Sequence, residues 1–400
     1  MLKATKVRIY PTPEQADFLN RQFGAVRFVF NKALHIMSSR YKCHGQSLNA
    51  KRDLKPLLAV AKKSRRYHWL KNFDSIALQQ GVINLDQAFQ KFFDPKLTNK
   101  YPRFKRKHGR QSSYHCVGVK LGDDWIKVPK CQPIKARIHR PVEGALKSIA
   151  LSRTATGKYY ASLLVDDGID ATPPLTVVSE DRVLGLDMGI SHIAIASNGV
   201  KTANPRFTQR AARNLKRKQQ ALSRKQNGSR GRAKARALVA RCHEKVANTR
   251  NDFQHKLSRK LVDENQAIAL ETLKVKNMLK NRKLAKHIAD ASWHSLISKL
   301  EYKMKEKGKH VVKIDQWFAS SKTCHCCGHK VEALPLDIRR WDCTNCGIKG
   351  MDRDINAALN IKQQGILKLK AEGLSVSANG GLRKTGETPA AAWEVGSLAR

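Results

Sequence analysis

Near the middle of the chain, residues 183–190 read VLGLDMGI, an apolar run that ends on the acid Asp187. Such a run is typical of a strand buried on both faces, and a second apolar run at residues 193–197 follows after a turn. The two runs predict a β-hairpin that opens a new structural unit. Asp187 then lies at the end of the first strand, where it is either a turn cap or part of a site.

Two further acids stand in similar surroundings. Glu271 directly follows the apolar run 267–270, and Asp354 lies within DRDINAAL (residues 352–359), where a helix is predicted to begin. Acids at the ends of adjacent buried strands and at a helix N-terminus can converge, and their oxygens suit a hard cation such as Mg²⁺ or Mn²⁺. Two such ions roughly 4 Å apart can align a water and stabilise the leaving oxygen in phosphodiester cleavage. Each acid alone could equally be a cap, and the residues by themselves do not show that the three meet.

The cysteines predict a structural metal site. Cys324 and Cys327 form one CxxC pair, Cys343 and Cys346 form another, and fifteen residues separate the pairs. This spacing is typical of a four-thiolate Zn²⁺ site, which leaves no open position for catalysis. His325 and Cys326 lie inside the first pair and are rival ligands. The total of nine cysteines is odd and no export signal is visible, so we expect reduced thiols and no disulfide framework.

The charge balance points to a polyanionic partner. The 400 residues include 77 Lys and Arg against 32 Asp and Glu, a formal net charge of +45. Residues 206–260 alone contain 18 basic residues and two acids, in a pattern that predicts a helical hairpin split near residues 228–231. Phosphate contact is therefore expected for this hairpin and for the basic loop 99–110. The candidate contact residues are Arg103, Lys105, Arg250, His255 and Lys256.

The first half of the chain divides into helical and strand patterns. A strand is predicted at residues 6–10 and a helical unit over residues 11–95, with one helix from about Ser75 to Phe93. Beyond residue 110 the pattern becomes β-rich, with strands at 148–152 and 159–165 around a Thr156-Gly157 turn. Residues 170–174 read as a linker, and residues 376–400 as a mobile tail.

The motifs and their order resemble the TnpB family of transposon-encoded, RNA-guided nucleases, which are related to type V CRISPR effectors. The resemblance spans nearly the whole chain. It is carried by the opening KVRIYPTPEQ (6–15), the first helix FGAVRFVFN (23–31), PRFK (102–105), DFQHKLS (252–258) and WFASSKTC (317–324), together with the acids and cysteines above. Met351 stands where the family commonly has His, and Ser75 stands where a basic residue can occur.

The resemblance implies a multidomain α+β and α/β fold. Asp187, Glu271 and Asp354 would form one RuvC active site on an RNase H-like core, with the zinc ribbon inserted late in that core. The expected domains are a β-barrel (wedge) domain at 1–10 and 111–174, a helical recognition domain at 11–110, the nuclease core at 175–318 and 351–375, and the ribbon at 319–350.

The resemblance also implies the partners. A guide RNA from the transposon end would be wrapped by the N-terminal half and the basic helices. The target would be double-stranded and single-stranded DNA. A short transposon-adjacent motif would be read by the helical unit, where Ser75 and Gln79 lie on one face of a helix. We expect one protein monomer per RNA, acting in the prokaryotic cytoplasm or nucleoid with no membrane partner, because no apolar run reaches the roughly 18 residues of a spanning helix.

Two other functions are compatible with parts of the pattern. A nuclease-silent, RNA-guided DNA-binding protein should lack acids of the triad, and all three are present. A transposase or resolvase acting without RNA would fit the core but leaves the extended basic surface unexplained. No GxxxxGK[ST] loop and no HExxH motif occurs in the sequence, so ATP-driven and zinc-protease chemistry are not indicated.

Overall fold

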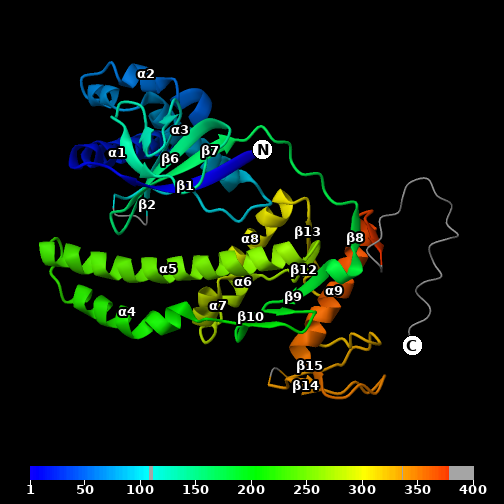
Figure 1. The fold of residues 1–400 in the computed structure, drawn as a ribbon. Coiled ribbons are helices and arrows are strands. Elements are labelled where there is room, and N and C mark those ends of the chain that lie inside the picture. The colour runs from blue at the N-terminus through cyan, green and yellow to red at the C-terminus, as the bar shows by residue number, and fades with distance from the viewer. Residues whose placement is uncertain (108–110, 336, 378–400) are drawn as a thin grey trace, which may run out of the picture. The chain divides into compact units, whose positions relative to one another are not determined.

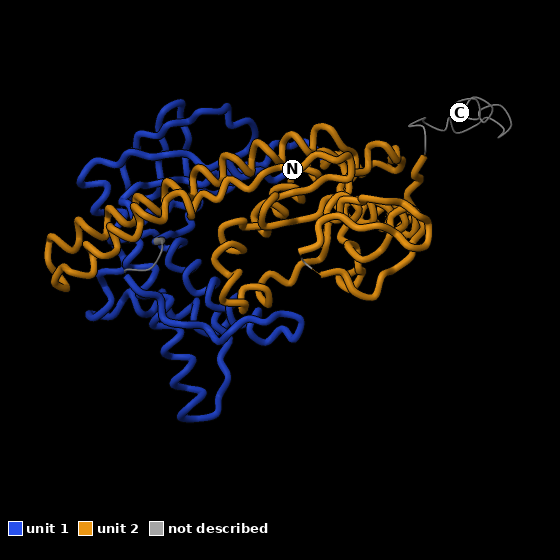
Figure 2. The backbone as a smooth tube through the Cα atoms, turned by 90° about the horizontal axis from the view of Figure 1, so that it is seen from below, with its two compact units in different colours: residues 1–170 blue, residues 171–400 orange. Residues whose placement is uncertain are grey.

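The computed structural model describes residues 1–107, 111–335 and 337–377, and the chain forms two compact units, residues 1–170 and 171–400 (Figure 2). The boundary falls at the linker predicted at residues 170–174. None of the helices in the described ranges combines the length and apolar character that crossing a membrane requires.

The first unit is built on a seven-stranded antiparallel sheet in the order β2-β6-β7-β1-β5-β4-β3. Its strands are β1 (Leu2–Tyr10), β2 (Gln111–Cys116), β3 (Lys120–Leu121), β4 (Trp125–Lys127), β5 (Ile134–Arg137), β6 (Ala145–Thr154) and β7 (Tyr159–Asp166). Val7 and Ile9 alternate with more exposed residues along β1, so one face of the central strand enters the core. The predicted strands at 6–10, 148–152 and 159–165 are confirmed, as is the turn, where Gly157 has a φ of 81°.

Helices cover this sheet and share its core. They are α1 (Pro13–His44), a π-helical turn (Ala50–Leu54), α2 (Leu57–Ala61), a 3-10 turn (His68–Asn72) and α3 (Ser75–Phe93). Thr12 and Gln15 cap the start of α1 reciprocally, and Gly45 ends it in the left-handed conformation. Phe23 of α1 packs edge-to-face on Tyr114 of β2 at 5.4 Å.

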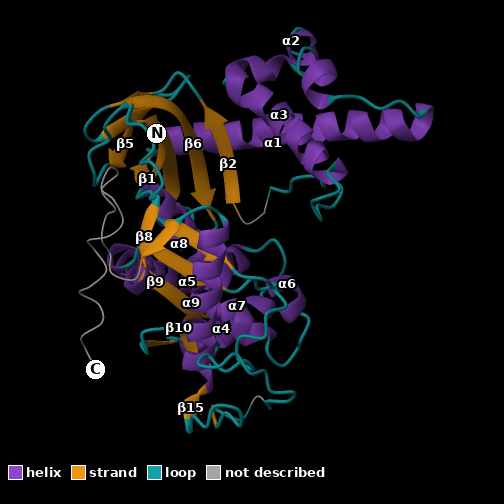
Figure 3. Ribbon diagram, turned by 90° about the vertical axis from the view of Figure 1, so that its right-hand side faces the viewer, coloured by secondary structure: helices purple, strands orange, loops and turns teal. Residues whose placement is uncertain are grey.

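Where a β-barrel was predicted, the structure shows a half-barrel sheet. In the described residues the sheet is open, with β2 and the two-residue strand β3 as its edges, and it curves against α1 as a half-barrel (Figure 3). One hydrophobic cluster runs from the sheet through α1 and α3. The helices therefore complete the hydrophobic core that the open sheet does not enclose by itself, and the sheet and the helical segment form one unit with a common core.

The second unit contains a five-stranded mixed sheet in the order β11-β10-β9-β12-β13. Its strands are β9 (Val183–Asp187), β10 (His192–Ala196), β11 (Lys201–Ala203), β12 (Ala267–Leu270) and β13 (His310–Lys313). β9, β12 and β13 run parallel, whereas β10 pairs antiparallel with β9, which confirms the predicted hairpin. The register places Leu186 beside Leu270. Asp187 and Glu271, the next residues along the chain, therefore lie at the same end of two neighbouring strands.

Helix α9 (Arg353–Ala371) lies directly on β9 and β12 (Figure 1). A Cβ at Gly185 would meet the Ala358 carbonyl oxygen at 2.1 Å, and one at Gly365 would meet Ala269 Cβ at 2.4 Å. Only glycine at these two positions permits so close an approach. The packing brings the first turn of α9, with Asp354, to the strand ends.

The remaining elements surround this core. They are β8 (Val177–Ser179), a 3-10 turn (Glu180–Arg182), α4 (Phe207–Ser223), α5 (Arg230–Glu264), α6 (Val275–Met278), α7 (Ala285–Ala291), α8 (Trp293–Glu306), β14 (Arg340–Trp341), β15 (Met351–Asp352) and β16 (Ser375–Ser377). The basic stretch is indeed a helical hairpin, α4 and α5. Residues 376 and 377, predicted as tail, instead belong to β16, which pairs with β8 and carries Val376 against the core. The rest of the predicted tail lies outside the described residues.

Candidate active site and zinc ribbon

The three acids singled out in the sequence converge at the ends of β9 and β12. Burial, together with the negative charges of Glu271 and Asp354, raises the pKa of Asp187 to about 7. Like charges have this effect only at short range in a poorly solvated place, because water screens them elsewhere. The sequence alone could not establish this convergence, and the parallel pairing of β9 with β12 provides it.

Hydrogen bonds hold two of the carboxylates in place. Ser320 Oγ donates to Glu271 Oε1 at 2.5 Å, and Ser320 is itself buried. Arg339 reaches Asp354 Oδ1 with a longer contact of 3.5 Å from an exposed position. Ser320 was not among the predicted site residues: it lies in the segment WFASSKTC (317–324), which was noted only as a family motif.

The neighbouring acid Asp352 has a different task. Its Oδ1 accepts from the backbone N–H groups of Asp354 and Ile355, which makes it the N-cap of α9, and its Oδ2 accepts from Lys201 Nζ at 2.6 Å. Burial opposes ionisation of Asp352, but the hydrogen bonds from Lys201 Nζ and from the backbone N–H groups of Ile355 and Asp354, with the positive charge of Lys201, together outweigh it and lower the pKa of Asp352. Both oxygens of Asp352 therefore accept hydrogen bonds within the protein, and Asp354 is the acid of this turn whose charge acts on Asp187.

The donor set fits a divalent cation. Burial and the charges of Glu271 and Asp354 disfavour ionisation of Asp187, and the Arg353 guanidinium lowers the pKa of Asp187 only as a minor effect. Hard oxygen ligands with excess negative charge are what Mg²⁺ and Mn²⁺ prefer. Among the described residues, only the four cysteines discussed next bring three or more ligand atoms within 4.8 Å of one another, so the carboxylates are spread more widely.

The four predicted cysteines form a compact thiol cluster. Cys324 Sγ lies 3.7 Å from Cys346 Sγ, and Cys327 Sγ lies 3.6 Å from Cys343 Sγ. Tetrahedral zinc with Zn–S bonds of about 2.3 Å places its sulfurs about 3.8 Å apart, so the cluster fits Zn²⁺. Gly328 and Gly347 both have a φ of 73° and turn each knuckle back on itself.

The rival zinc ligands lie elsewhere. Cys326 is exposed and outside the cluster. His325 Nδ1 lies 3.2 Å from Met351 Sδ and 3.1 Å from Asn356 Oδ1. The unusual Met351 is thus buried against the first knuckle, where it forms part of the small ribbon core.

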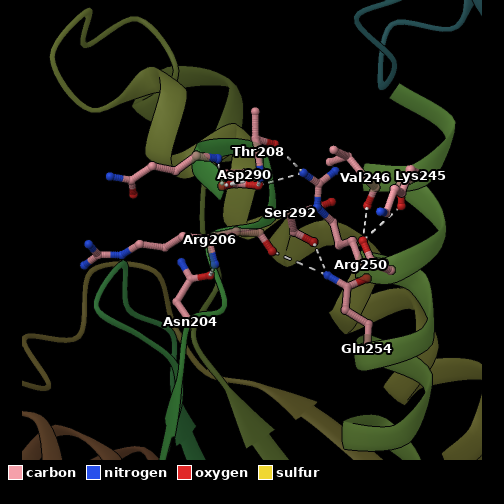
Figure 4. Close-up of polar contacts among 12 residues, drawn as sticks. Asn204, Arg206, Thr208, Lys245, Val246, Arg250, Gln254, Asp290 and Ser292 are labelled. Atoms are coloured by element: carbon pink, nitrogen blue, oxygen red, sulfur yellow. Dashed lines mark hydrogen bonds and ion pairs between the residues drawn. The ribbon is translucent and has the colours of Figure 1, made fainter. Parts of the chain in front are cut away.

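Arg250 of α5 is engaged within the protein. Its Nη2 donates to Asp290 Oδ1 at 2.7 Å and to Thr208 Oγ1 at 2.8 Å, and Asp290 also accepts from the backbone N–H groups of Thr208 and Gln209 (Figure 4). The buried Asp290 therefore ties the first turn of α4 to α5 and α7. This assigns Arg250 to holding the base of the hairpin, which differs from the predicted phosphate contact.

The other predicted contact residues remain on the surface. His255 and Lys256 are exposed on α5. Lys256 forms an ion pair with Asp252 at 2.8 Å, and because the pair is solvated, replacing it by a contact with phosphate costs little free energy. Arg103 and Lys105 are exposed on the loop before residue 108, and the backbone of Lys105 is hydrogen-bonded to the Asn31 side chain of α1.

Ser75 and Gln79 line one open groove of about 970 Å³ at the start of α3. Lys62 Nζ donates to Ser75 Oγ at 2.7 Å. Six basic side chains share the lining of this groove: Lys51, Arg52, Lys55, Lys62, Lys63 and Lys71. A concave surface with this charge suits a nucleic-acid backbone.

Comparison with known proteins places these features in a family. Three family models match the chain: "Helix-turn-helix domain" at residues 1–46, "Probable transposase" at 168–282, and "Cas12f1-like, TNB domain" at 293–361. In the structure, residues 1–46 contain β1 and the single long helix α1 in place of a helix-turn-helix. The third match ends within α9 and includes all four cysteines.

Relatives match over most of their length. A protein of Streptomyces pristinaespiralis named "Putative RNA-guided DNA endonuclease" is 40% identical over 369 residues, covering 91% of this chain and 89% of the relative. The similarly named InsQ of Escherichia coli K12 is 29% identical, covering 91% and 92%.

A solved structure shows the same fold. The chain of a Cas12f1–sgRNA–target DNA complex aligns with a TM-score of 0.53 at 13% identity, covering 88% of this chain and 83% of that one. The extent and identity of the sequence matches show that the chain belongs to the TnpB family, whose relatives carry the name RNA-guided DNA endonuclease.

Proposed function

We propose that this protein is an RNA-guided endonuclease that cuts DNA beside a short transposon-adjacent motif by metal-dependent phosphodiester hydrolysis. The observation that carries the proposal is the convergence of Asp187, Glu271 and Asp354 at the ends of β9 and β12. The order of the five-stranded sheet, with α9 across its central strands, supports a RuvC-type, RNase H-like core.

The carboxylates would hold Mg²⁺ or Mn²⁺. When bound, the cations supply an activated water and stabilise charge on the leaving oxygen. The chain itself contributes the orientation: Ser320 fixes one oxygen of Glu271, and the Asp352 cap fixes the first turn of α9. The four cysteines would hold one structural Zn²⁺.

The partners follow from charge and from the relatives. A net charge of +45 destabilises a compact chain through self-repulsion, which a bound polyanion relieves, and the hairpin of α4 and α5 exposes His255 and Lys256 toward solvent. We assign guide RNA to this hairpin and to the basic groove of the first unit, with target DNA pairing to that RNA. One protein per RNA, acting in the cytoplasm, completes the proposal.

Gln79 is expected to help select the adjacent DNA motif, because it lines the basic groove and its amide can pair with adenine in the major groove. Gln79→Ala should relax the motif preference by about 1–3 kcal/mol, the value of one bidentate base contact. A cleavage library with randomised flanking sequence measures this preference.

The matched control is Gln80→Ala, because Gln80 donates to Asn84 on α3 and does not line the groove. Its motif preference should equal that of the wild type. An unchanged preference and unchanged cutting in Gln79→Ala would remove this face of α3 from the recognition surface.

The proposal is tested by the RNA that the protein carries. Expressed together with the DNA that flanks its gene, the protein should purify with one discrete RNA species from the transposon end. Sequencing of the retained RNA identifies the guide. Cutting of DNA by RNA-free protein would instead favour a transposase or resolvase, and RNA-dependent binding without cutting would favour a nuclease-silent protein.

A further inference from the structure

Two buried amides connect α9 to the first zinc knuckle. Asn356 and Asn360 are 1% and 3% exposed, and they lie four residues apart on one face of the helix. Asn360 Nδ2 donates to the carbonyl oxygens of Ser320 at 2.8 Å and Thr323 at 2.5 Å. Asn356 Nδ2 donates to Thr323 O at 2.7 Å, and its Oδ1 accepts from His325 N at 2.9 Å.

The segment held in this way, residues 320–325, touches both candidate metal sites. At one end, Ser320 Oγ donates to Glu271 Oε1. Cys324, a member of the thiol cluster, lies four residues later. The helix that holds the segment, α9, begins at Arg353, and Asp354 lies two residues before Asn356. A short stretch of backbone therefore joins the ribbon to two of the three carboxylates.

The bonds in this segment are costly to break. A buried donor or acceptor that loses its partner keeps the full penalty of its desolvation, so the amides and the carbonyl oxygens hold one another in a single arrangement. The backbone of Ser320 is thus held by α9 at the position from which its hydroxyl group donates to Glu271. Groups that orient a metal ligand commonly matter nearly as much as the ligand.

We infer that Ser320 is a positioning residue for Glu271, and that Asn356 and Asn360 make the cation affinity of the carboxylate site depend on the folded ribbon. The inference rests on the proposed metal-dependent site. It assigns the ribbon a role in catalysis that requires no nucleic-acid contact: the ribbon keeps Ser320, and through it Glu271, in the geometry that binds a cation.

The test measures Mn²⁺ binding to the full-length, RNA-free protein by electron paramagnetic resonance, with zinc content and melting temperature from the same samples. Asp187→Ala gives the background binding. Ser320→Ala should bind Mn²⁺ about 10- to 100-fold more weakly than the wild type while retaining one zinc. Asn360→Asp, which places a carboxylate oxygen against two carbonyl oxygens, should weaken binding in the same direction.

Two variants serve as matched controls. Ser321→Ala removes the neighbouring hydroxyl, which has no side-chain hydrogen bond within the described residues, and should bind as the wild type does. Asn198→Asp makes the same isosteric change as Asn360→Asp at an exposed turn, where its oxygen still accepts from Val200 N, and should also leave binding unchanged.

The outcomes separate the inference from the proposed function. Wild-type Mn²⁺ affinity in Ser320→Ala would overturn the inference and leave the carboxylate site standing. Loss of zinc together with Mn²⁺ in Ser320→Ala would show a purely structural serine, which also overturns it. Wild-type binding no stronger than that of Asp187→Ala would remove the carboxylate site itself.

Discussion

Asp354→Asn is expected to abolish cleavage of guide-matched DNA and to leave guide-directed DNA binding intact. The substitution keeps the size of the side chain and removes the negative charge that acts on Asp187. Loss of a cation ligand removes several kcal/mol of transition-state stabilisation, which is at least about 100-fold in rate. Asp187→Ala and Glu271→Ala should have the same effect, measured as initial cleavage rate at saturating Mg²⁺ with binding followed separately by gel shift.

The matched control is Asp352→Asn, two residues away. The amide oxygen can still cap α9, and the main loss is the charge paired with Lys201. A helix cap contributes about 1 kcal/mol, so even partial loss should lower stability slightly and leave cutting largely intact. If Asp352→Asn stopped cutting while Asp354→Asn did not, the assignment of the third carboxylate would be wrong.

Cys343→Ser is expected to lower the zinc content from about one ion per chain to about zero and to unfold the ribbon. The buried core of the ribbon consists of Trp341, Met351 and two of the cysteines, with only a few partly buried residues around them. So small a core cannot stabilise the fold alone, and in such modules metal binding supplies about 10–16 kcal/mol of folding free energy. Elemental analysis and protease sensitivity between residues 319 and 350 report the two effects.

Cys326→Ser provides the comparison, because Cys326 is exposed and lies in the same knuckle without joining the cluster. Its zinc content and protease resistance should match those of the wild type. Zinc loss in Cys326→Ser with retention in Cys343→Ser would contradict the ribbon assignment, since the ion would then be held by another set of thiols.

Much of the nuclease unit could be predicted from local sequence pattern. The runs that end on Asp187 and Glu271 are short, apolar and bounded by turns, and the structure confirms both as strands. The predicted helix start near Asp354 is confirmed, although its capping residue is Asp352 and not Asp354. Cysteine spacing alone identified the four clustered thiols, because a ribbon requires that spacing.

What the sequence could not supply are the partners of polar residues far apart in the chain. Asn356 and Asn360 look like ordinary polar helix residues, and only the packing of α9 on the knuckle buries them. Arg250 lies in a run of basic residues. Its ion pair with Asp290, 40 residues later, therefore cannot be predicted from the residues around it.

The first unit shows the same limit on a larger scale. Strand and helix periods indicated a helical unit over residues 11–95 and a β-rich stretch beyond residue 110, but periodicity does not reveal which faces pack together. Val7 and Ile9 of β1 and Phe23 of α1 belong to one hydrophobic cluster, so the sheet and the helices form a single body. Along a strand, buried and exposed residues alternate in the same way in a half-barrel covered by helices and in a closed barrel.

The central claim, that the RNA directs a single carboxylate site to cut DNA, is tested most directly by changing the guide. Protein reconstituted with the identified RNA, its guide segment rewritten, should cut a plasmid at the newly matched sequence beside the motif and no longer at the original one. Cutting should require Mg²⁺ or Mn²⁺ and should vanish in Asp187→Ala. Cutting that stays at the old site, or that persists in Asp187→Ala, would contradict the account.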